Sequence, residues 1–209
     1  MKIWILVTGE EEGLWPRRCG AAEFAEAVRR AAEEPPRSRE ERKLSAEGWE
    51  VLIAPSPAAR RTAELCVEGG SRLEEPLLSP VTERPYREDG ERPLWLWRLM
   101  ALVQRRRGDP RQGESRKALA ARAEELFARL AEEEKDRILI ADRLLAGELM
   151  DRARIHGCDL ARTGMFAPSP WERILITRRD QHCGGCRHNC LLSNPGCGVG
   201  RDKAARKSG

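Results

Sequence analysis

The 209-residue chain lacks any long apolar run and contains only three histidines. No uninterrupted apolar stretch approaches the roughly 20 residues that a membrane-spanning helix requires, and the run after Lys2 is too short for the core of a signal peptide. We therefore expect a cytoplasmic protein with no membrane partner.

No charge of one sign dominates the chain. Charged residues make up 34% of it, with a formal net charge of +4, so a polyanionic partner is only weakly indicated. The C-terminal tail is basic and could contact nucleic-acid phosphates, but it has no aromatic side chains on which bases would stack. A solvated tail is the simpler interpretation, and a nucleic-acid partner is the alternative. The basic residues of the tail are Arg201, Lys203, Arg206 and Lys207.

The cysteines are unevenly distributed along the chain. Four of the seven cysteines, Cys183, Cys186, Cys190 and Cys197, fall within fifteen positions near the end of the chain. In a reducing compartment, such crowding favours metal ligation over disulfides. The other three, Cys19, Cys66 and Cys158, are isolated and are expected to be small core residues.

The cysteine spacing of two, three and six intervening residues leaves the metal open. Structural zinc more often has two separated cysteine pairs, while no standard ferredoxin spacing is matched, so an iron-sulfur cluster and Zn2+ are both retained. His182 and His188 are alternate ligands. The segment has few apolar residues, so metal binding would supply much of its folding free energy.

Short apolar runs alternate with amphipathic segments along the first 177 residues. This order predicts an α/β fold, a three-layer sandwich on a largely parallel central sheet, followed by a small Cys-rich loop. The predicted domains are 1–177 and 178–209. In the helix at 93–107, most of the surface, including Trp95, Leu99 and Leu102, is expected to be covered. Strands are expected at 3–7, 51–54, 137–141 and 171–177, helices at 20–34, 93–107, 115–134 and 144–155, and an Ala-rich helical turn within 55–66.

Several short frames at the ends of these segments match one family. Leu44, Ser45 and Gly48 fit a Leu-Ser/Thr-x-x-Gly turn, and residues 54–64, APSPAARRTAE, fit a strand ending in Ser-Pro-Leu-x-Arg-Ala-x-Gln-Thr-Ala-Glu. Gly-Glu-Ser at 113–115 precedes a long helix. In order and wording, the chain resembles the histidine phosphatase superfamily, the phosphoglycerate-mutase-like fold, over residues 1–177. The helix that this family usually has between the Leu-Ser/Thr-x-x-Gly turn and its second strand is missing.

The same comparison shows that the reactive positions have changed. The family's first strand ends in Arg-His-Gly-Glu, where this chain has Val7 and Thr8 before Gly-Glu. The position of a phosphate-binding arginine is Ala58, and that of the second histidine is Arg143. The resemblance places Glu83 where the family has its general acid.

Phosphoryl transfer in this family requires an imidazole that accepts the phosphoryl group and cations that hold its oxygens. The histidines, His156, His182 and His188, do not follow predicted strands, and Val7 and Ala58 neither donate hydrogen bonds nor carry charge. The resemblance thus implies a non-catalytic domain that acts in binding, regulation or metal and redox sensing, with a protein or an anionic ligand as its unknown partner.

Two alternatives stay open. An active phosphatase or mutase could use Glu10, Glu83 and Arg143, or the cluster could serve a nucleic-acid or redox module. Arg143, with Arg60 or Arg61, could also hold an anion at the sheet edge, although solvated surface arginines explain these residues more simply.

Overall fold

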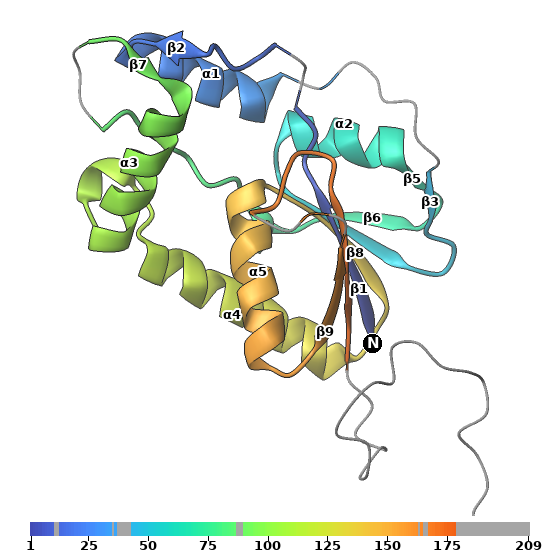
Figure 1. The fold of residues 1–209 in the computed structure, drawn as a ribbon. Coiled ribbons are helices and arrows are strands. Elements are labelled where there is room, and N and C mark those ends of the chain that lie inside the picture. Colours follow the sequence, from blue (N-terminus) through green and yellow to red (C-terminus); the bar gives the residue numbers. More distant parts are fainter. Residues whose placement is uncertain are drawn as a thin grey trace, which may run out of the picture. The chain divides into compact units, whose positions relative to one another are not determined.

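Six strands form one mixed sheet in the order β6-β4-β8-β1-β10-β9 (Figure 1). In this computed structural model, the described residues are 1–10, 13–34, 36, 43–86, 90–162, 164 and 167–178. β10 runs antiparallel to both of its neighbours, and the other three pairings are parallel. The predicted α/β fold with a largely parallel sheet is thereby confirmed. The strands are β1 (Lys2–Val7), β4 (Glu50–Ile53), β6 (Ser71–Glu74), β8 (Arg137–Ala141), β9 (Asp159–Arg162) and β10 (Arg173–Thr177).

The interior strands are the ones that the apolar runs predicted. β8 is buried along its whole length and lies between β4 and β1. Its one charged residue, Arg137, is 3% exposed and pairs with Glu50 and Glu133, so its charge is not left alone in the core.

The two outer strands have no apolar run and were not predicted. Every residue of β6, SRLE, is exposed, and β9, DLAR, alternates between exposed and half-buried positions. An edge strand needs to bury less surface than a central one, so its sequence carries a weaker signal. The predicted strand at 171–177 begins later, at Arg173.

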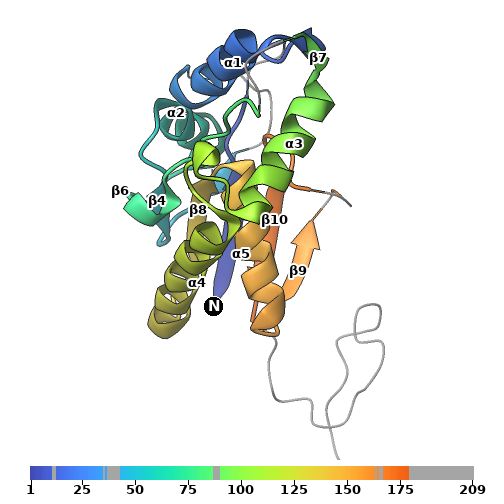
Figure 2. The same ribbon diagram turned by 90° about the vertical axis from the view of Figure 1, so that its left-hand side faces the viewer.

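Five α-helices are found among the described residues. α1 packs on α2, while α4 and α5 pack together, as Figure 2 shows. The Ser56, Ser115 and Asp142 side chains cap the N-termini of α2, α4 and α5. The helices are α1 (Ala21–Glu33), α2 (Pro57–Cys66), α3 (Leu94–Arg107), α4 (Arg116–Glu133) and α5 (Arg143–Ile155). Shorter elements are β2 (Arg18–Cys19), β3 (Leu44–Ser45), β5 (Val67–Glu68), η1 (Pro76–Leu78), β7 (Arg92–Pro93) and η2 (Pro110–Gln112).

The prediction for the covered face of α3 was wrong. Trp95 is 64% exposed, and Leu99 and Leu102 are exposed as well. The helix instead buries Trp97, whose ring stacks on Phe24 with the ring centroids 5.5 Å apart. The Trp97 Nε1–H also donates to the Cys19 carbonyl, at 2.9 Å. This small second core orients α3 through one large ring that bonds to a polar partner, which apolar periodicity alone does not reveal.

One expectation about composition is confirmed in the described ranges. Cys19, Cys66 and Cys158 are all buried, as expected of small core residues. Within these ranges, no helix combines the length and the apolar character that crossing a bilayer requires. The Cys-rich loop that was predicted at the C-terminus lies outside the described residues.

Candidate functional site

A cavity of about 490 Å³ lies at the C-terminal ends of β1, β4 and β8. Thr8 follows β1, Ser56 follows β4, and Asp142 follows β8, and all three line it. The ends of parallel strands meet at one sheet edge, which is where such folds place their ligands. One side of the cavity is formed by α1, through Ala25, Val28 and other residues. We refer to it as the first cavity.

The structure brings together four of the predicted site residues. Thr8, Glu10, Glu83 and Arg143 all line the first cavity although they come from three separate parts of the chain. None of the described lining residues is a histidine.

The other predicted positions lie elsewhere. Val7 and Ala58 are buried in the protein and do not line the cavity. Arg60 pairs with Glu74 and Arg61 with Glu64, both on the exposed surface. The anion site that would have joined Arg143 to one of these arginines is therefore not formed, because α2 directs both guanidinium groups to acidic neighbours.

Arg143 is already paired inside the first cavity. Its Nη2–H donates to the Glu83 Oε2 at 2.5 Å, and the two side chains are 22% and 8% exposed. A buried carboxylate next to a guanidinium neutralises the charge that would attract a phosphate. Arg143 is thus one half of an ion pair within the cavity.

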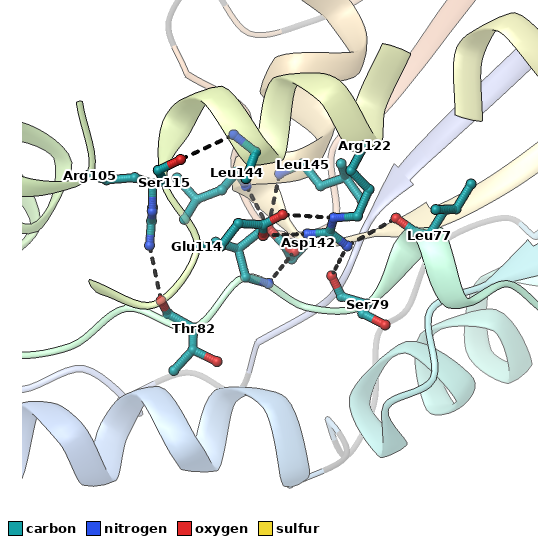
Figure 3. A network of polar contacts seen from close by, with 12 residues as sticks. Leu77, Ser79, Thr82, Arg105, Glu114, Ser115, Arg122, Asp142, Leu144 and Leu145 are labelled. Atoms are coloured by element: carbon teal, nitrogen blue, oxygen red, sulfur yellow. Dashed lines mark hydrogen bonds and ion pairs between the residues drawn. The ribbon is translucent and has the colours of Figure 1, made fainter. Parts of the chain in front are cut away.

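The segment that carries Glu83 is clamped from α4 (Figure 3). The Arg122 Nη1–H groups donate to the carbonyl oxygens of Leu77 and Ser79, at 3.0 and 2.7 Å. The same guanidinium forms a bidentate pair with Glu114, through Nε and Nη2, at 3.0 and 2.7 Å. One arginine thereby fixes the chain just before Glu83 and bonds to Glu114, the middle residue of the Gly-Glu-Ser segment.

Asp142 also holds the segment that carries Glu83, through hydrogen bonds to the backbone. Its carboxylate accepts the backbone N–H groups of Val81, Leu144 and Leu145, at 2.9, 2.7 and 3.1 Å (Figure 3). Burial raises the pKa of Asp142, and these three donors oppose that change because they favour the carboxylate. Its oxygens are occupied by the protein's own backbone.

Glu10 and Arg98 complete the charged surroundings. The Trp15 Nε1–H donates to Glu10 Oε2 at 2.5 Å, and the Arg98 guanidinium lies 4.2 Å from the centre of the Trp15 ring. Burial lowers the pKa of Arg98, and the nearby Arg143 lowers it further. Trp15, Arg98 and Asp142 were not among the predicted site residues. Only Asp142 had a signal in the sequence, as a capping residue between a predicted strand and helix.

The turn after β1 is closed by an aromatic ring. A Cβ on Gly9 would lie 2.2 Å from the Trp171 ring, so only glycine fits there. The Trp171 Nε1–H donates to the Glu10 carbonyl at 3.2 Å. This contact fixes the backbone beside Thr8.

The described part of the chain contains no group of three or more histidine, cysteine, aspartate or glutamate residues that could hold a metal ion. The predicted ligands Cys183, Cys186, Cys190 and Cys197, and the alternates His182 and His188, lie outside the described residues.

No family model, no curated protein and no solved structure matches this chain.

Proposed function

We propose that residues 1–177 form a non-catalytic domain of the histidine-phosphatase type that binds a small ligand in the first cavity. The proposal includes a three-layer sandwich. Along the sheet, the chain moves one way from β4 to β6 and the opposite way from β6 to β8. If the connections between parallel strands are right-handed, this reversal puts α1 and α2 on one face of the sheet and α4 and α5 on the other.

The observation that carries the proposal is the ion pair between Arg143 and Glu83. It lies in a cavity whose described lining has a threonine, not a histidine, after the first strand. A threonine hydroxyl is a weak nucleophile without an adjacent base, and Arg143, the cation that follows β8, is neutralised by Glu83.

The lining of the first cavity favours an uncharged ligand. The acidic residues Glu10, Glu33, Glu83 and Asp142 nearly balance Arg29, Arg84 and Arg143. The remaining lining is largely apolar, including Val28, Val81 and Leu144. Small apolar molecules with a few polar groups suit such a surface.

Turnover of a generic phosphate ester by the purified full-length protein tests the non-catalytic proposal. We expect no hydrolysis above the buffer rate. Hydrolysis that persists through purification and disappears in Arg143→Ala would instead support the second candidate, an active phosphatase with atypical groups. That candidate is favoured by one observation, namely that Glu10, Glu83 and Arg143 converge on the same cavity.

For residues 178–209 we propose a metal-binding segment with Cys183, Cys186, Cys190 and Cys197 as ligands, for a regulatory or sensing role. Four thiolates suit either an iron-sulfur cluster or Zn2+. Protein purified without oxygen is analysed for metals and by absorption spectroscopy. Brown protein with iron and sulfide supports the cluster, and colourless protein with one zinc per chain supports zinc. Native protein free of metal overturns both.

A nucleic-acid or redox module remains the third candidate. Reversible bleaching by dithionite would favour a redox role, and salt-dependent binding of RNA or DNA that is lost on truncation after Gly200 would favour the other.

A further inference from the structure

A second cavity, of about 370 Å³, lies among α3, α4 and α5. Its lining is rich in arginine, and two of its described residues, Glu148 and Asp151, are acidic. It shares Arg143 with the first cavity. The arginines that line it are Arg105, Arg106, Arg116, Arg143, Arg154 and Arg162.

Most of these arginines have acidic partners. Arg143 pairs with Glu83, and Arg162 pairs with Glu172 at 2.8 Å. Arg116 pairs with Glu148 and Asp151, and Arg154 pairs with Asp151. The lining nevertheless retains an excess of positive charge.

Arg105 is buried, and no ion pair with an acidic residue is found for it among the described residues. It is 2% exposed, and its Nη2–H donates to the Thr82 carbonyl at 3.0 Å (Figure 3). Its buried Nε and Nη1 groups have no hydrogen-bond partner within the described structure. Burial lowers the pKa of Arg105, and the negative charges of Glu83 and Asp142 oppose this. A buried guanidinium that uses one of its donor groups is costly, and bound water or an anion is the usual explanation.

Glu148 has a buried acceptor without a donor, whereas Arg105 has buried donors without an acceptor. Its Oε1 accepts the Arg116 Nε–H at 3.1 Å, but its buried Oε2 has no donor in the part of the chain that the structure describes. A simple anion would satisfy Arg105 and leave this oxygen unpaired. A ligand that satisfies both must carry acceptors and one acidic proton.

We propose that the second cavity binds a protonated phosphate group, either as inorganic phosphate or as a phosphate monoester. Its unprotonated oxygens accept the free N–H groups of Arg105, and its P–OH donates to Glu148 Oε2. Sulfate has the same shape but no proton to donate near neutral pH, so it leaves Glu148 unpaired and is rejected. This site does not depend on the function proposed for the first cavity.

Calorimetric titration of the full-length protein tests the site, at about pH 6, where a phosphate monoester is half-protonated. The ligands are inorganic phosphate, phosphoserine and sulfate at matched ionic strength. We expect saturable binding of phosphate and an affinity for sulfate at least about tenfold lower. Tighter binding of phosphoserine than of phosphate assigns the site to monoesters, and the reverse order assigns it to the free ion.

Two matched substitutions locate the site. Gly147→Leu places a side chain in the second cavity, where the nearest described atom to a Cβ on Gly147 is Pro168 Cδ, at 3.8 Å. Ala25→Leu does the same on the exposed α1 wall of the first cavity. Both positions are helical, so both variants are expected to fold. Gly147→Leu is expected to abolish phosphate binding, and Ala25→Leu to leave it unchanged.

Two further variants test the chemistry. Arg105→Met is expected to weaken phosphate binding at least about tenfold, while Arg60→Met, which removes a charge remote from both cavities, leaves it unchanged. Glu148→Gln, which supplies a donor in place of an acceptor, is expected to narrow the preference for phosphate over sulfate. If Arg105→Met fails to fold, Gly147→Leu and Glu148→Gln still test whether phosphate binds in the second cavity.

The proposal is overturned by any of three results: no saturable phosphate binding, equal affinity for phosphate and sulfate in the unsubstituted protein, or binding that Ala25→Leu removes and Gly147→Leu does not.

Discussion

The two cavities share the Arg143 side chain but differ in how their charges are satisfied. Among the residues that line the first, Arg143 bonds to Glu83, and Asp142 accepts three backbone N–H groups. In the second, Arg105 and Glu148 each keep buried polar atoms without partners among the described residues. Charges that are paired within the protein hold the fold together and add little attraction for an ion. Charges that are left unpaired in a buried place point to a group that binds there.

The largest predicted effect comes from breaking the pair in the first cavity. Arg143→Met leaves the 8% exposed Glu83 carboxylate without its guanidinium, so we expect a loss of about 3 kcal/mol in the free energy of unfolding. Denaturant unfolding measures it. The double variant Arg143→Met/Glu83→Leu is expected to recover most of that loss. A single variant as stable as the unsubstituted protein would show that the pair is not structural.

The clamp on the segment before Glu83 is expected to give the next largest effect. Arg122→Met removes the donors to Leu77 and Ser79 and the partner of Glu114, which costs about 2 kcal/mol. Lys117→Met, on the same helix, is the matched control at an exposed position. Equal unfolding midpoints for these two variants would contradict the role given to Arg122.

Arg105 is expected to behave in the opposite way to Arg143. Arg105→Met removes a desolvated charge and one hydrogen bond, so the free energy of unfolding should change by no more than about 1 kcal/mol when no phosphate is added. The same unfolding experiment compares it with Arg143→Met. A loss as large as that of Arg143→Met would mean that the protein itself satisfies Arg105, and the contrast between the cavities would fail.

The last effect appears only at acid pH and concerns the wall of the second cavity, where Arg162 pairs with Glu172. Burial would raise the pKa of Glu172, but the Ser169 and Gly164 N–H groups and the Arg162 guanidinium together hold it below its ordinary value of 4.5. Because the folded-state pKa is the lower one, this stabilisation is present above pH 4.5 and is lost as the pH falls through the folded value.

Glu172→Gln is therefore expected to flatten the loss of stability below pH 4.5, by at most about 1.4 kcal/mol per pH unit. Unfolding followed as a function of pH for both proteins measures this difference. Parallel curves would show that Glu172 titrates in the same way in the folded and unfolded states.

Apolar runs were sufficient to predict the interior strands and the buried face of α4, where Leu119, Leu126 and Leu130 lie as expected. They failed for β6 and β9, because edge strands bury little, and for α3, because the single ring of Trp97 outweighs three exposed apolar residues. Tertiary contacts of this kind depend on residues far apart in the chain.

Thr8, Glu83 and Arg143, which the sequence comparison singled out, line one cavity. The spacing of residues along the sequence could not show that Arg143 bonds to Glu83. The second cavity had no signal at all. Arg105 lies in the arginine-rich end of α3, and its burial depends on how three helices meet.

The contrast between paired and unpaired charge is tested most directly by crystals of the full-length protein soaked in arsenate, which shares the shape and proton of phosphate and is located by its anomalous scattering. The account predicts an arsenic peak in the second cavity, within hydrogen-bonding distance of Arg105 and Glu148. A peak beside Thr8 and Arg143 in the first cavity, or no peak in either, would contradict it.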